Sequence, residues 1–388
     1  MKKAVIVIPT YNEKENIGPL LDAIVGNIFP KIKNYKMQIV VVDDNSPDGT
    51  AKVVEAKKKN NNDIHLITGK KEGLGKAYVR GMNYAVEKLN ADILFEMDAD
   101  GQHEPKEIPN FLKKIDEGHD IVLGTRYSGG GSIPPNWPIQ RKVFSILGNL
   151  IVRTILGRFS LHDWTGGYRA FNKKVFEKGK GYMGSYKGYT FQVAFLHKSL
   201  QKGFRAAEIP INFQDRKLGH SKIAPSEFIV DLLKYLIVER FLEILKSPFP
   251  KYGLTGVVGY LINAISLELL TKAGLHPGIA AMIGAELSII WNFTLNNLWS
   301  FRGHTISHPY ALLSKFFQFN LVSAGSLIII TTIVSIGTHL FGNTSFVRQL
   351  SLIIAIGFFV VPYSYTMYNI FIWKRWHIRQ LEWLQRRF

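Results

Sequence analysis

Two carboxylates separated by one residue give this chain its clearest candidate for chemistry. Asp98 and Asp100 follow the apolar residues 93–95, and Gln102 adds a third side-chain oxygen two positions later. Residues two apart at the end of a strand point the same way. Carboxylate and amide oxygens suit Mg²⁺ or Mn²⁺, hard ions that also share phosphate oxygens. Many Asp-x-Asp sequences are only solvated turns, so the position after a strand carries this prediction of a metal and diphosphate site.

A second acidic pair, Asp43 and Asp44, ends another apolar run. Acidic residues at that position commonly bind the sugar hydroxyls or base edges of a nucleotide. Residues 43–49 fit an Asx-turn equally well, because they are rich in turn formers. The chain has no Gly-x-Gly-x-x-Gly after its first predicted strand and no Gly-x-x-x-x-Gly-Lys-[Ser/Thr]. Dinucleotide and P-loop nucleotide binding are therefore disfavoured.

Short apolar runs and segments of helical length alternate along residues 1–222. We predict strands at residues 5–8, 38–42, 64–67, 93–96 and 121–123, and helices at 16–25, 49–59, 75–89 and 105–117. This alternation predicts an α/β fold with a parallel, doubly wound sheet. Ligands bind such sheets at the carboxyl ends of the strands, where both acidic pairs lie.

The C-terminal part contains four long apolar stretches, at residues 253–271, 277–299, 319–341 and 350–372. Each is near the roughly 20 residues that a membrane-spanning helix needs. The alternative is a soluble bundle of four buried helices. Glu268 and Glu286 are the only charges in these stretches, and we expect them to make polar contacts between helices. Residues 297–301 resemble residues 369–373, which suggests a duplicated helical hairpin.

Basic residues around these stretches predict the orientation. Only Lys272 and Arg348 lie on one side, and the residues on the other side are Lys246, Lys251, Arg302, Lys315, Lys374, Arg375, Arg379, Arg386 and Arg387. The positive-inside rule then predicts a multi-pass membrane protein with both termini in the cytoplasm. The N-terminal apolar run, residues 4–8, is too short for a signal peptide. We therefore expect the N-terminal half to stay in the cytoplasm.

Residues 226–246 combine an apolar stripe with charged positions. This pattern predicts an amphipathic helix on the membrane surface, although a core-facing helix has the same pattern. Residues 141–157 form a weaker second candidate. The predicted divisions are a cytoplasmic catalytic domain at 1–222, an interface helix and linker at 223–250, a transmembrane domain at 251–376 and a basic tail at 377–388.

Composition narrows the classes of partner. The 388 residues contain 48 Lys and Arg against 30 Asp and Glu, a net charge of +18. Residues 121–222 hold much of the excess, with 17 basic and 4 acidic residues. Nucleic acid, an anionic membrane or phosphorylated ligands would all suit this charge, but the four apolar stretches count against nucleic acid. Cysteine is absent, which excludes disulfides, thiolate metal sites and a cysteine nucleophile.

Several motifs together resemble glycosyltransferase family 2, and within it the dolichol-phosphate (polyprenyl-phosphate) mannose synthase group. They lie at residues 8–13, 41–50, 71–75, 97–105, 124–127, 136–142, 165–171 and 216–222. Residues 251–253, 292–293 and 297–301 are similar to the GtrA-like membrane domain fused to some of these synthases. The resemblance implies a GT-A-type Rossmann-like catalytic domain, amphipathic interface helices and a four-helix transmembrane domain.

The resemblance also implies a role for each matching residue. The nucleoside of a nucleotide-sugar would be held by Pro9, Tyr11, Glu13, Val42 and Asp44. The diphosphate and the Mg²⁺ or Mn²⁺ ion would be held by Asp98, Ala99, Asp100 and Gln102, with Asp98, Asp100 and Gln102 as the metal ligands. Arg126, Arg141 and Ser145 would receive the acceptor phosphate, and Arg216 and Lys222 would contact the donor phosphates or close a loop over them.

One motif departs from the family. Its Gly-Phe-Lys reads Gly188-Tyr189-Thr190 here, so Lys187 is the candidate replacement for the missing lysine. His103 and His220 are expected to be hydrogen-bonding loop residues rather than metal ligands, because neither has a second histidine at ligand spacing.

The activity implied is inverting transfer of a hexose to a polyprenyl (dolichyl) phosphate at the cytoplasmic membrane face. Mannose from GDP-mannose is favoured, and the product would be a lipid-linked phosphosugar for glycan or glycoprotein assembly. Glucose from UDP-glucose fits nearly the same motifs. A processive polysaccharide synthase is disfavoured because the chain has no Gln-x-x-Arg-Trp. A lipid-sugar flippase or transporter is the alternative from a different class, since carboxylates inside membrane helices are costly unless they function.

Overall fold

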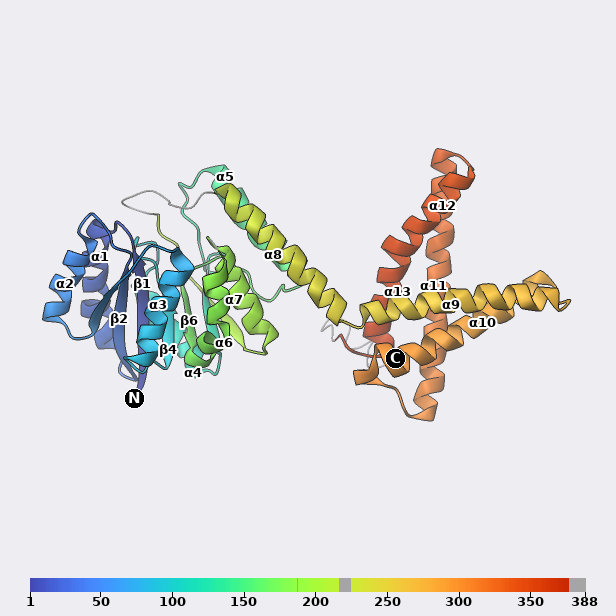
Figure 1. Cartoon of the computed structure of the whole chain (residues 1–388), viewed down its shortest axis with the longest axis horizontal. Coiled ribbons are helices and arrows are strands. Elements are labelled where there is room, and N and C mark those ends of the chain that lie inside the picture. Colours follow the sequence, from blue (N-terminus) through green and yellow to red (C-terminus); the bar gives the residue numbers. More distant parts are fainter. Residues whose placement is uncertain (187, 216–224, 377–388) are drawn as a thin grey trace. The chain divides into compact units, whose positions relative to one another are not determined.

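The computed structural model describes residues 1–186, 188–215 and 225–376, in two compact units (Figure 1). Unit 1 is Met1–Arg240 and unit 2 is Phe241–Phe388. The division falls inside one helix, α8 (Pro225–Lys246), so the boundaries at 222 and 250 stay predictions. Arg216, Lys222, Lys187, His220 and the basic tail at 377–388 lie outside the described residues.

A seven-stranded sheet forms the centre of unit 1, in the order β3-β2-β1-β4-β6-β5-β7. The strands are β1 (Lys2–Thr10), β2 (Tyr35–Asp43), β3 (Ile64–Thr68), β4 (Ile93–Glu96), β5 (Ile121–Thr125), β6 (Arg169–Asn172) and β7 (Ala206–Pro210). All five predicted strands are confirmed. The prediction of a fully parallel sheet is wrong at one strand, because β6 runs antiparallel to β4 and β5. The segment before β6 lies at the carboxyl edge of the sheet, where Asp163 contacts Arg126 at the end of β5. The chain starts β6 from that edge, because no crossover first returns it to the amino edge, and β6 therefore runs antiparallel to its neighbours.

Helices cover both faces of the sheet, as a doubly wound fold requires (Figure 1). They are α1 (Lys14–Asp22), α2 (Thr50–Asn60), α3 (Leu74–Glu87), α4 (Ile108–Asp116), α5 (Ile139–Leu156), α6 (Lys173–Ser185), α7 (Thr190–Gln201) and α8. Alternate residues of β1 face opposite sides: Ile6 and Ile8 pack with α1, α2 and α4, whereas Val5 and Val7 pack with α3, α6 and α7. This period of two is what places two apolar layers around one sheet.

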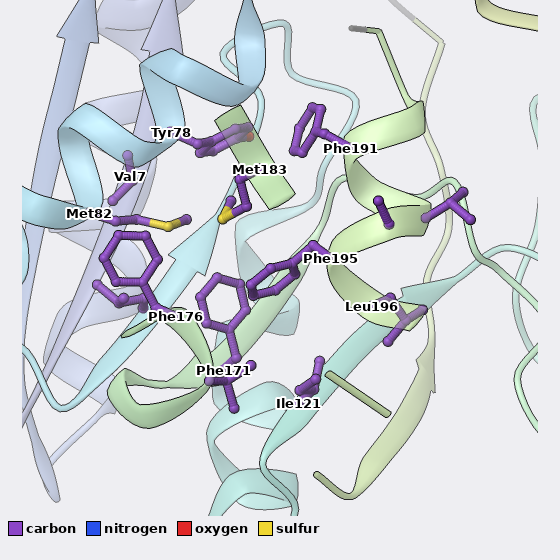
Figure 2. Close-up of a cluster of buried hydrophobic side chains, with 14 of the residues drawn as sticks. Val7, Tyr78, Met82, Ile121, Phe171, Phe176, Met183, Phe191, Phe195 and Leu196 are labelled. Atoms are coloured by element: carbon purple, nitrogen blue, oxygen red, sulfur yellow. The ribbon is translucent and has the colours of Figure 1, made fainter. Parts of the chain in front are cut away.

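Aromatic side chains fill the layer under α3, α6 and α7 (Figure 2). Phe171 of β6 lies 5.0 Å from Phe195 of α7 between ring centroids, and Tyr78 of α3 lies 6.2 Å from Phe191. Helix α3 lies so close to β1 that a Cβ at Gly81 would come within 2.4 Å of Val7. The close packing fixes α3, which carries Tyr78 and Arg80 into the site described below.

Helices α5 and α8 each divide between a buried and an exposed face. Leu232 and Leu236 of α8 lie in the same buried cluster as Val152 and Leu156 of α5. Elsewhere on both helices large apolar side chains are exposed, namely Ile139, Val143, Phe144, Ile146, Leu147, Leu150 and Ile151 of α5 and Ile229, Val230, Ile237 and Val238 of α8. The prediction of a single membrane-facing stripe on residues 226–246 is therefore wrong in part, because Leu232 and Leu236 of that stripe pack in the domain core.

Unit 2 is helical. Its helices are α9 (Phe249–Lys272), α10 (Pro277–Leu295), α11 (Pro309–Phe341), α12 (Ser345–Ile354) and α13 (Val361–Met367), and its π-helical segments are η4 (Asn296–Ser300), η6 (Ala355–Val360) and η7 (Tyr368–Ile372). Among the residues that the structure describes, four spans are long and apolar enough to cross a membrane: Phe249–Lys272, Pro277–Ser300, Pro309–Phe341 and Ser345–Ile372. At most 17% of each apolar window is buried, so a soluble bundle with buried helices does not describe this unit.

The two resembling segments of unit 2 occupy equivalent places. Residues 297–301 begin within η4 and residues 369–373 begin within η7, and each π-helical turn ends the second span of a helical hairpin. The two segments also touch, since Trp373 Nε1 donates to Asn297 Oδ1 at 3.1 Å. This shared local structure agrees with a duplicated hairpin.

The two membrane carboxylates differ from the expectation. Glu268 pairs with Lys272 in its own helix, at 3.1 Å between Oε1 and Nζ, and both side chains are exposed. Glu286 is exposed on α10. The expected polar contact between helices is wrong for Glu268, because it lies one turn from the end of α9, where Lys272 is the nearest cation.

Candidate active site

The loop after β4 carries the predicted metal ligands. Asp100 Oδ1 accepts a hydrogen bond from the Gln102 backbone N–H at 3.1 Å, across Gly101 with φ of 75°. The Gln102 side-chain nitrogen donates to the carbonyl of Gln214 at 3.2 Å, so its oxygen is the atom available to a ligand. Asp100 and Gln102 are buried, whereas the Asp98 side chain is one-third exposed. The loop thus presents an oxygen-only donor set.

This donor set fits a hard divalent ion that also binds a diphosphate. Among the described residues, no three His, Asp or Glu side chains are grouped so that they alone could hold a metal. Asp98, Asp100 and the Gln102 amide would therefore supply part of the coordination shell, and phosphate oxygens would supply more. Mg²⁺ and Mn²⁺ are commonly bound in this shared manner.

Asp98 is held from two sides. The hydroxyl of Tyr78 donates to Asp98 Oδ1 at 3.1 Å, and the Asp98 backbone N–H donates to His103 Nδ1 at 3.1 Å. Burial, followed by the charge of Asp98, raises the pKa of Tyr78 well above its ordinary value, so the phenol keeps its proton. His103 stacks on Tyr168 with ring centroids 4.8 Å apart. His103 is thus the hydrogen-bonding loop residue that the sequence predicts.

A buried arginine fixes the loop that lies beside Asp98. Arg169 of β6 donates to the carbonyls of Trp164, Gly166 and Gln192 at 2.7–2.8 Å. Glu96 of β4 is its partner in the strand register, and burial raises the pKa of that carboxyl to about 7. The three carbonyl contacts order residues 164–166 and the start of α7.

The predicted nucleoside-binding residues lie at the carboxyl ends of β1 and β2. Pro9 and Val42 are partners in the parallel register, and Asp44 follows β2 directly. Lys71 lies over the ring of Tyr11, with Nζ 3.6 Å from the centroid. The Glu13 backbone N–H donates to Thr50 Oγ1 at 3.0 Å, and Ala99 is buried in the β4 loop. These residues share one edge of the sheet, as predicted.

Asp44 already has a cationic partner. The guanidinium of Arg80, on α3, contacts Asp44 Oδ1 in a short ion pair. Burial raises the pKa of Asp44 above its ordinary value, and the charge and hydrogen bond of Arg80 act in the opposite direction. Arg80 therefore favours the ionised form of Asp44 against the effect of burial.

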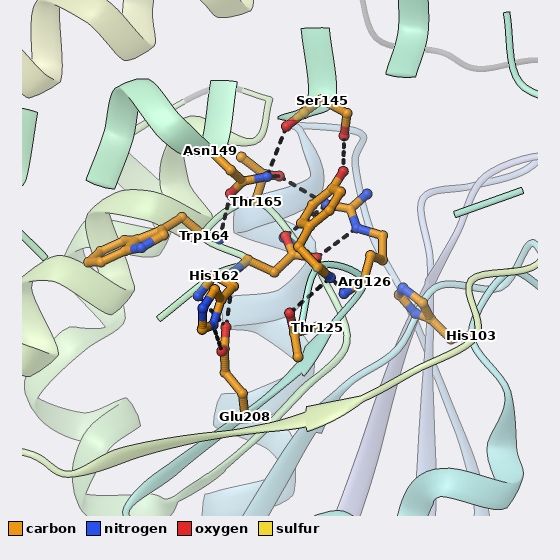
Figure 3. A network of polar contacts seen from close by, with 12 residues as sticks. His103, Thr125, Arg126, Ser145, Asn149, His162, Trp164, Thr165 and Glu208 are labelled. Carbon is orange, nitrogen blue, oxygen red and sulfur yellow. Dashed lines mark hydrogen bonds and ion pairs between the residues drawn. The ribbon is translucent and has the colours of Figure 1, made fainter. Parts of the chain in front are cut away.

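Arg126 leaves the end of β5 and meets a buried carboxylate (Figure 3). Asp163 Oδ2 accepts from Arg126 Nε at 2.7 Å, and Asp163 Oδ1 accepts from Arg126 Nη2 at 2.8 Å. Nη2 also donates to Thr165 Oγ1 at 3.1 Å. Planar two-point contacts of this kind fix a guanidinium in orientation as well as in position.

Both members of this pair remain charged. Burial alone would lower the pKa of Arg126, but the charge and hydrogen bonds of Asp163 outweigh it and raise that pKa. Burial would raise the pKa of Asp163, yet the charge and hydrogen bonds of Arg126 keep it below its ordinary value. The carboxylate is therefore a permanent anion that is committed to Arg126 at neutral pH.

The other two predicted acceptor-phosphate residues lie on α5. Ser145 Oγ is 2.5 Å from the Tyr127 hydroxyl, and its carbonyl accepts from Asn149 at 3.0 Å. Arg141 lies over the indole of Trp137, 3.8 Å from the ring centroid. Asn149 Nδ2 also reaches Thr165 Oγ1 at 3.4 Å, so Ser145 and Arg126 belong to one polar network.

The loop that carries Asp98 and the side chain of Arg126 converge on the same short segment. A Cβ at Gly167 would lie 3.5 Å from Asp98 Oδ2, while Thr165, two residues earlier, bonds to Arg126. Tyr189 lies within electrostatic range of both sides: burial and then the charge of Asp98 raise its pKa, and Arg126 lowers it. Asp98 and Arg126 are therefore both adjacent to the short segment at residues 163–167.

Four residues that contact this site are not predicted from the sequence to have a role. They are Asp163, which orients Arg126; Arg80, which pairs with Asp44; Tyr78, which bonds to Asp98; and Lys71, which lies over Tyr11. The available signals are that Lys71 lies inside a recognised motif and that Asp163 lies two residues before one. Arg80 and Tyr78 have no local signal, because only the packing of α3 on β1 brings them to the strand ends.

Comparison with known proteins places both parts of the chain in described families. Residues 5–180 match the model of glycosyl transferase family 2. Residues 251–373 match the model of the GtrA/DPMS transmembrane domain. The two matches lie in unit 1 and unit 2, respectively.

Three curated proteins are similar over most of their own lengths. The polyprenol monophosphomannose synthase of Mycolicibacterium smegmatis is 38% identical over 227 residues, which is 58% of this chain and 82% of that protein. The undecaprenyl-phosphate mannosyltransferase of Micrococcus luteus is 34% identical over 62% of this chain and 96% of that protein. The dolichol-phosphate mannosyltransferase of Pyrococcus furiosus is 32% identical over 81% of this chain and 85% of that protein.

Among solved structures, the glucosyl-3-phosphoglycerate synthase of Mycobacterium tuberculosis in complex with UDP aligns with a TM-score of 0.44 at 16% identity. That alignment covers 62% of this chain and 80% of that chain. The same enzyme with Mn²⁺, UDP-glucose and phosphoglyceric acid aligns with a TM-score of 0.43 at 17% identity, over 61% of this chain and 80% of that chain.

Proposed function

Because this chain belongs to glycosyl transferase family 2, we propose that it transfers mannose from GDP-mannose to the phosphate of a polyprenyl (dolichyl) lipid. The relatives named for polyprenol-, undecaprenyl- and dolichol-phosphate mannosyl transfer support the acceptor class and the sugar. The observation that carries the proposal is the segment 163–167. It contacts the acceptor-side Arg126 through Asp163 and approaches the donor-side Asp98 through Gly167.

The reaction joins two phosphorylated substrates at one carbon. A phosphate oxygen of the lipid forms a bond to the anomeric carbon as the bond from that carbon to the diphosphate breaks. Attack from the face opposite the leaving group inverts the anomeric configuration, and nucleoside diphosphate leaves. The incoming phosphate is already an anion near neutral pH, so the protein has to position it rather than deprotonate it.

The state of Asp163 agrees with a reaction that needs no protein base. Its two oxygens accept from the Arg126 side chain and backbone N–H and from the Gly166 N–H. A carboxylate engaged in this way does not collect a proton readily, and its pKa is held down by Arg126. We assign Arg126, Arg141 and Ser145 to the acceptor phosphate, since guanidinium groups bind phosphate oxygens in pairs.

The donor diphosphate is assigned to Asp98, Ala99, Asp100 and Gln102, and the nucleoside to Pro9, Tyr11, Glu13, Val42 and Asp44. Arg216 and Lys222 keep their proposed donor-phosphate role, although they lie outside the described residues. A bound Mg²⁺ or Mn²⁺ would stabilise the negative charge on the leaving diphosphate. Asp98 is held for that task by Tyr78 and His103.

A membrane is the expected source of the acceptor. The exposed apolar side chains of α5 include Phe144 and Leu147, on the helix that also carries Arg141 and Ser145. An amphipathic helix of this kind lies at the interface of a bilayer, where a polyprenyl phosphate presents its headgroup. The basic flanks of the four spans support a cytoplasmic location for the catalytic domain and both termini.

The direct test is transfer by the full-length protein in proteoliposomes containing polyprenyl phosphate. GDP-mannose, UDP-glucose and UDP-N-acetylglucosamine are each offered with Mg²⁺ or Mn²⁺, and lipid-linked sugar is measured by mass spectrometry. We expect transfer from GDP-mannose and none after the ion is chelated. Transfer only from a UDP-sugar would overturn the donor assignment, and no transfer from any donor would overturn the reaction itself.

Two controls separate synthesis from transport. Liposomes that lack polyprenyl phosphate should give no lipid-linked sugar. Pre-formed lipid-linked mannose should stay on its original leaflet, whether or not Asp100 is replaced by alanine. A protein that moves this lipid across the bilayer as an Asp100→Ala variant would be a flippase instead.

A further inference from the structure

Glu208 of β7 contacts the segment that carries the partner of Arg126, and neither its sequence position nor the motifs give it a role. Its Oε1 accepts from the backbone N–H groups of His162 and Asp163 at 2.6 and 2.9 Å. Its Oε2 lies 2.7 Å from His162 Nδ1. Only 9% of the Glu208 side chain is exposed. One carboxylate therefore ties two successive backbone amides to the edge strand of the sheet (Figure 3).

From Glu208 the contacts continue to Arg126 without a gap. Asp163, whose N–H is held by Glu208, binds the Nε and Nη2 side of the guanidinium. Thr165 Oγ1 accepts the second hydrogen of Nη2. Three of the five N–H donors of the side chain are then used. Within the described part of the chain, the two N–H donors of Nη1 have no protein partner, which leaves that nitrogen for a ligand.

We propose that Glu208 is a positioning residue for the acceptor phosphate, acting through Asp163 on Arg126. This inference rests on the proposed function, in which Arg126 receives that phosphate. Arg126 and Asp163 together carry no net charge. Arg126 would therefore recognise the phosphate through the orientation of its remaining N–H donors more than through net charge. A displacement of the backbone at residues 162–163 would rotate the Asp163 carboxylate and, with it, the plane of the Arg126 guanidinium.

The chemistry of Glu208 predicts which substitutions preserve this role. Glu208→Gln keeps an oxygen that accepts from both amides and places an N–H donor at His162 Nδ1. Glu208→Asp keeps the charge but is one methylene shorter, so the oxygen is withdrawn from the amides. Glu208→Ala removes both contacts. The hydrogen-bond geometry should therefore survive in the glutamine variant alone.

The test uses steady-state kinetics of the full-length protein, with the donor sugar that the wild-type protein accepts and polyprenyl phosphate in proteoliposomes. We expect Glu208→Ala and Glu208→Asp to raise the KM for polyprenyl phosphate about tenfold, because contacts to a charged group are lost. The KM for the donor and the Mn²⁺ affinity, measured by electron paramagnetic resonance, should change less than about twofold. Glu208→Gln should restore the acceptor KM.

Asp120 provides a matched structural control at the opposite end of the same strand pair. Its carboxylate accepts from the Arg205 backbone N–H at 2.8 Å, just before β7 begins, and it lies before the amino end of β5, whereas Arg126 follows the carboxyl end of that strand. Asp120→Ala should lower the melting temperature as Glu208→Ala does while leaving the acceptor KM unchanged. A rise in the acceptor KM for Asp120→Ala would mean that any loosening of β7 has this effect, and would overturn a specific role of Glu208.

Other outcomes also decide the matter. An acceptor KM within twofold of wild type in both Glu208→Ala and Glu208→Asp, an equal rise of both substrate KM values, or a glutamine variant as impaired as alanine would each overturn the proposal. If Glu208→Ala does not fold, the aspartate and glutamine variants give the same comparison. Failure of the proposed function is visible separately, as a wild-type protein that transfers no sugar or an Arg126→Ala variant with an unchanged acceptor KM.

Discussion

The proposed donor side and the proposed acceptor side of the site are positioned in different ways. Asp98, Asp100 and Gln102 lie in one loop, and a hydrogen bond between Asp100 and Gln102 spans only two residues. Arg126 instead depends on Asp163, 37 residues away, and Asp163 depends on Glu208, a further 45 residues along the chain. Local turn geometry therefore orders part of the proposed donor loop, with Tyr78 and Gln214 adding contacts from a distance, whereas the contacts described for Arg126 are all long-range.

This difference has a consequence for function. A substitution in the donor loop should affect ion binding and turnover while it leaves the acceptor arginines in place. A substitution in the acceptor network should affect recognition of the lipid phosphate and the stability of unit 1 together, since the same buried groups serve both. The following variants test that separation.

Asp100→Ala should have the largest effect. It removes a buried carboxylate that we propose as a metal ligand in the loop after β4. We therefore expect turnover to fall by roughly 10³-fold. Mn²⁺ binding, followed by electron paramagnetic resonance, should weaken in parallel. Asp22→Ala, at an exposed surface ion pair, is the control. Full activity of Asp100→Ala would remove the metal assignment.

Asp163→Asn should strongly destabilise unit 1 at neutral pH, by about 3 kcal/mol, because Arg126 is left as a buried charge without its anion. Arg126 holds the pKa of Asp163 below its ordinary value, so this stabilisation exists above the unfolded-state pKa near 4 and is lost as the pH falls through the folded-state pKa. Thermal unfolding of the full-length protein in detergent, from pH 7 to pH 3, measures it. The difference from wild type should shrink at the acidic end, and a constant difference would contradict an ionised Asp163.

Arg126→Ala should lower kcat/KM for polyprenyl phosphate by roughly 10²-fold and leave Mn²⁺ binding unchanged, because charged hydrogen bonds to the phosphate are lost. Arg126→Lys should recover only part of this, since an ammonium cannot match the planar contacts with Asp163. Arg205→Ala removes an exposed arginine near the other end of β7 and serves as the control. Weakened Mn²⁺ binding in Arg126→Ala would break the separation of the two sides.

Lys71→Met should have the smallest effect. Its ammonium lies over the Tyr11 ring, and a cation–π contact at an exposed site is worth about 0.5–1 kcal/mol. We therefore expect the donor KM to rise by roughly two- to fivefold with an unchanged acceptor KM. Lys70→Met, the neighbouring lysine, should match wild type. An acceptor-side effect of Lys71→Met would show that the two sides are coupled through this loop.

Much of the architecture follows from patterns of short range. The alternating apolar runs predict five of the seven strands, and the four apolar stretches predict the helices of unit 2. The apolar pattern does not predict β6, because one of its four residues is the charged Arg169. Burial of Arg169 depends on tertiary hydrogen bonds to three carbonyls. The antiparallel direction of β6 was equally hidden, since strand direction depends on where the preceding loop ends.

The sequence by itself determined which residues are candidates to hold phosphates and a metal. Carboxylates after apolar runs and arginines in recognised motifs are identified from the residues next to them in the chain. Tertiary structure decided how those residues are held. Only the packing of α3 on β1 brings Tyr78 to Asp98, and only the return of the chain across the strand ends pairs Asp163 with Arg126. It also decided that Leu232 and Leu236 of the α8 stripe are buried. The physical reason is that these contacts join residues distant in the chain, and no local pattern encodes such pairs.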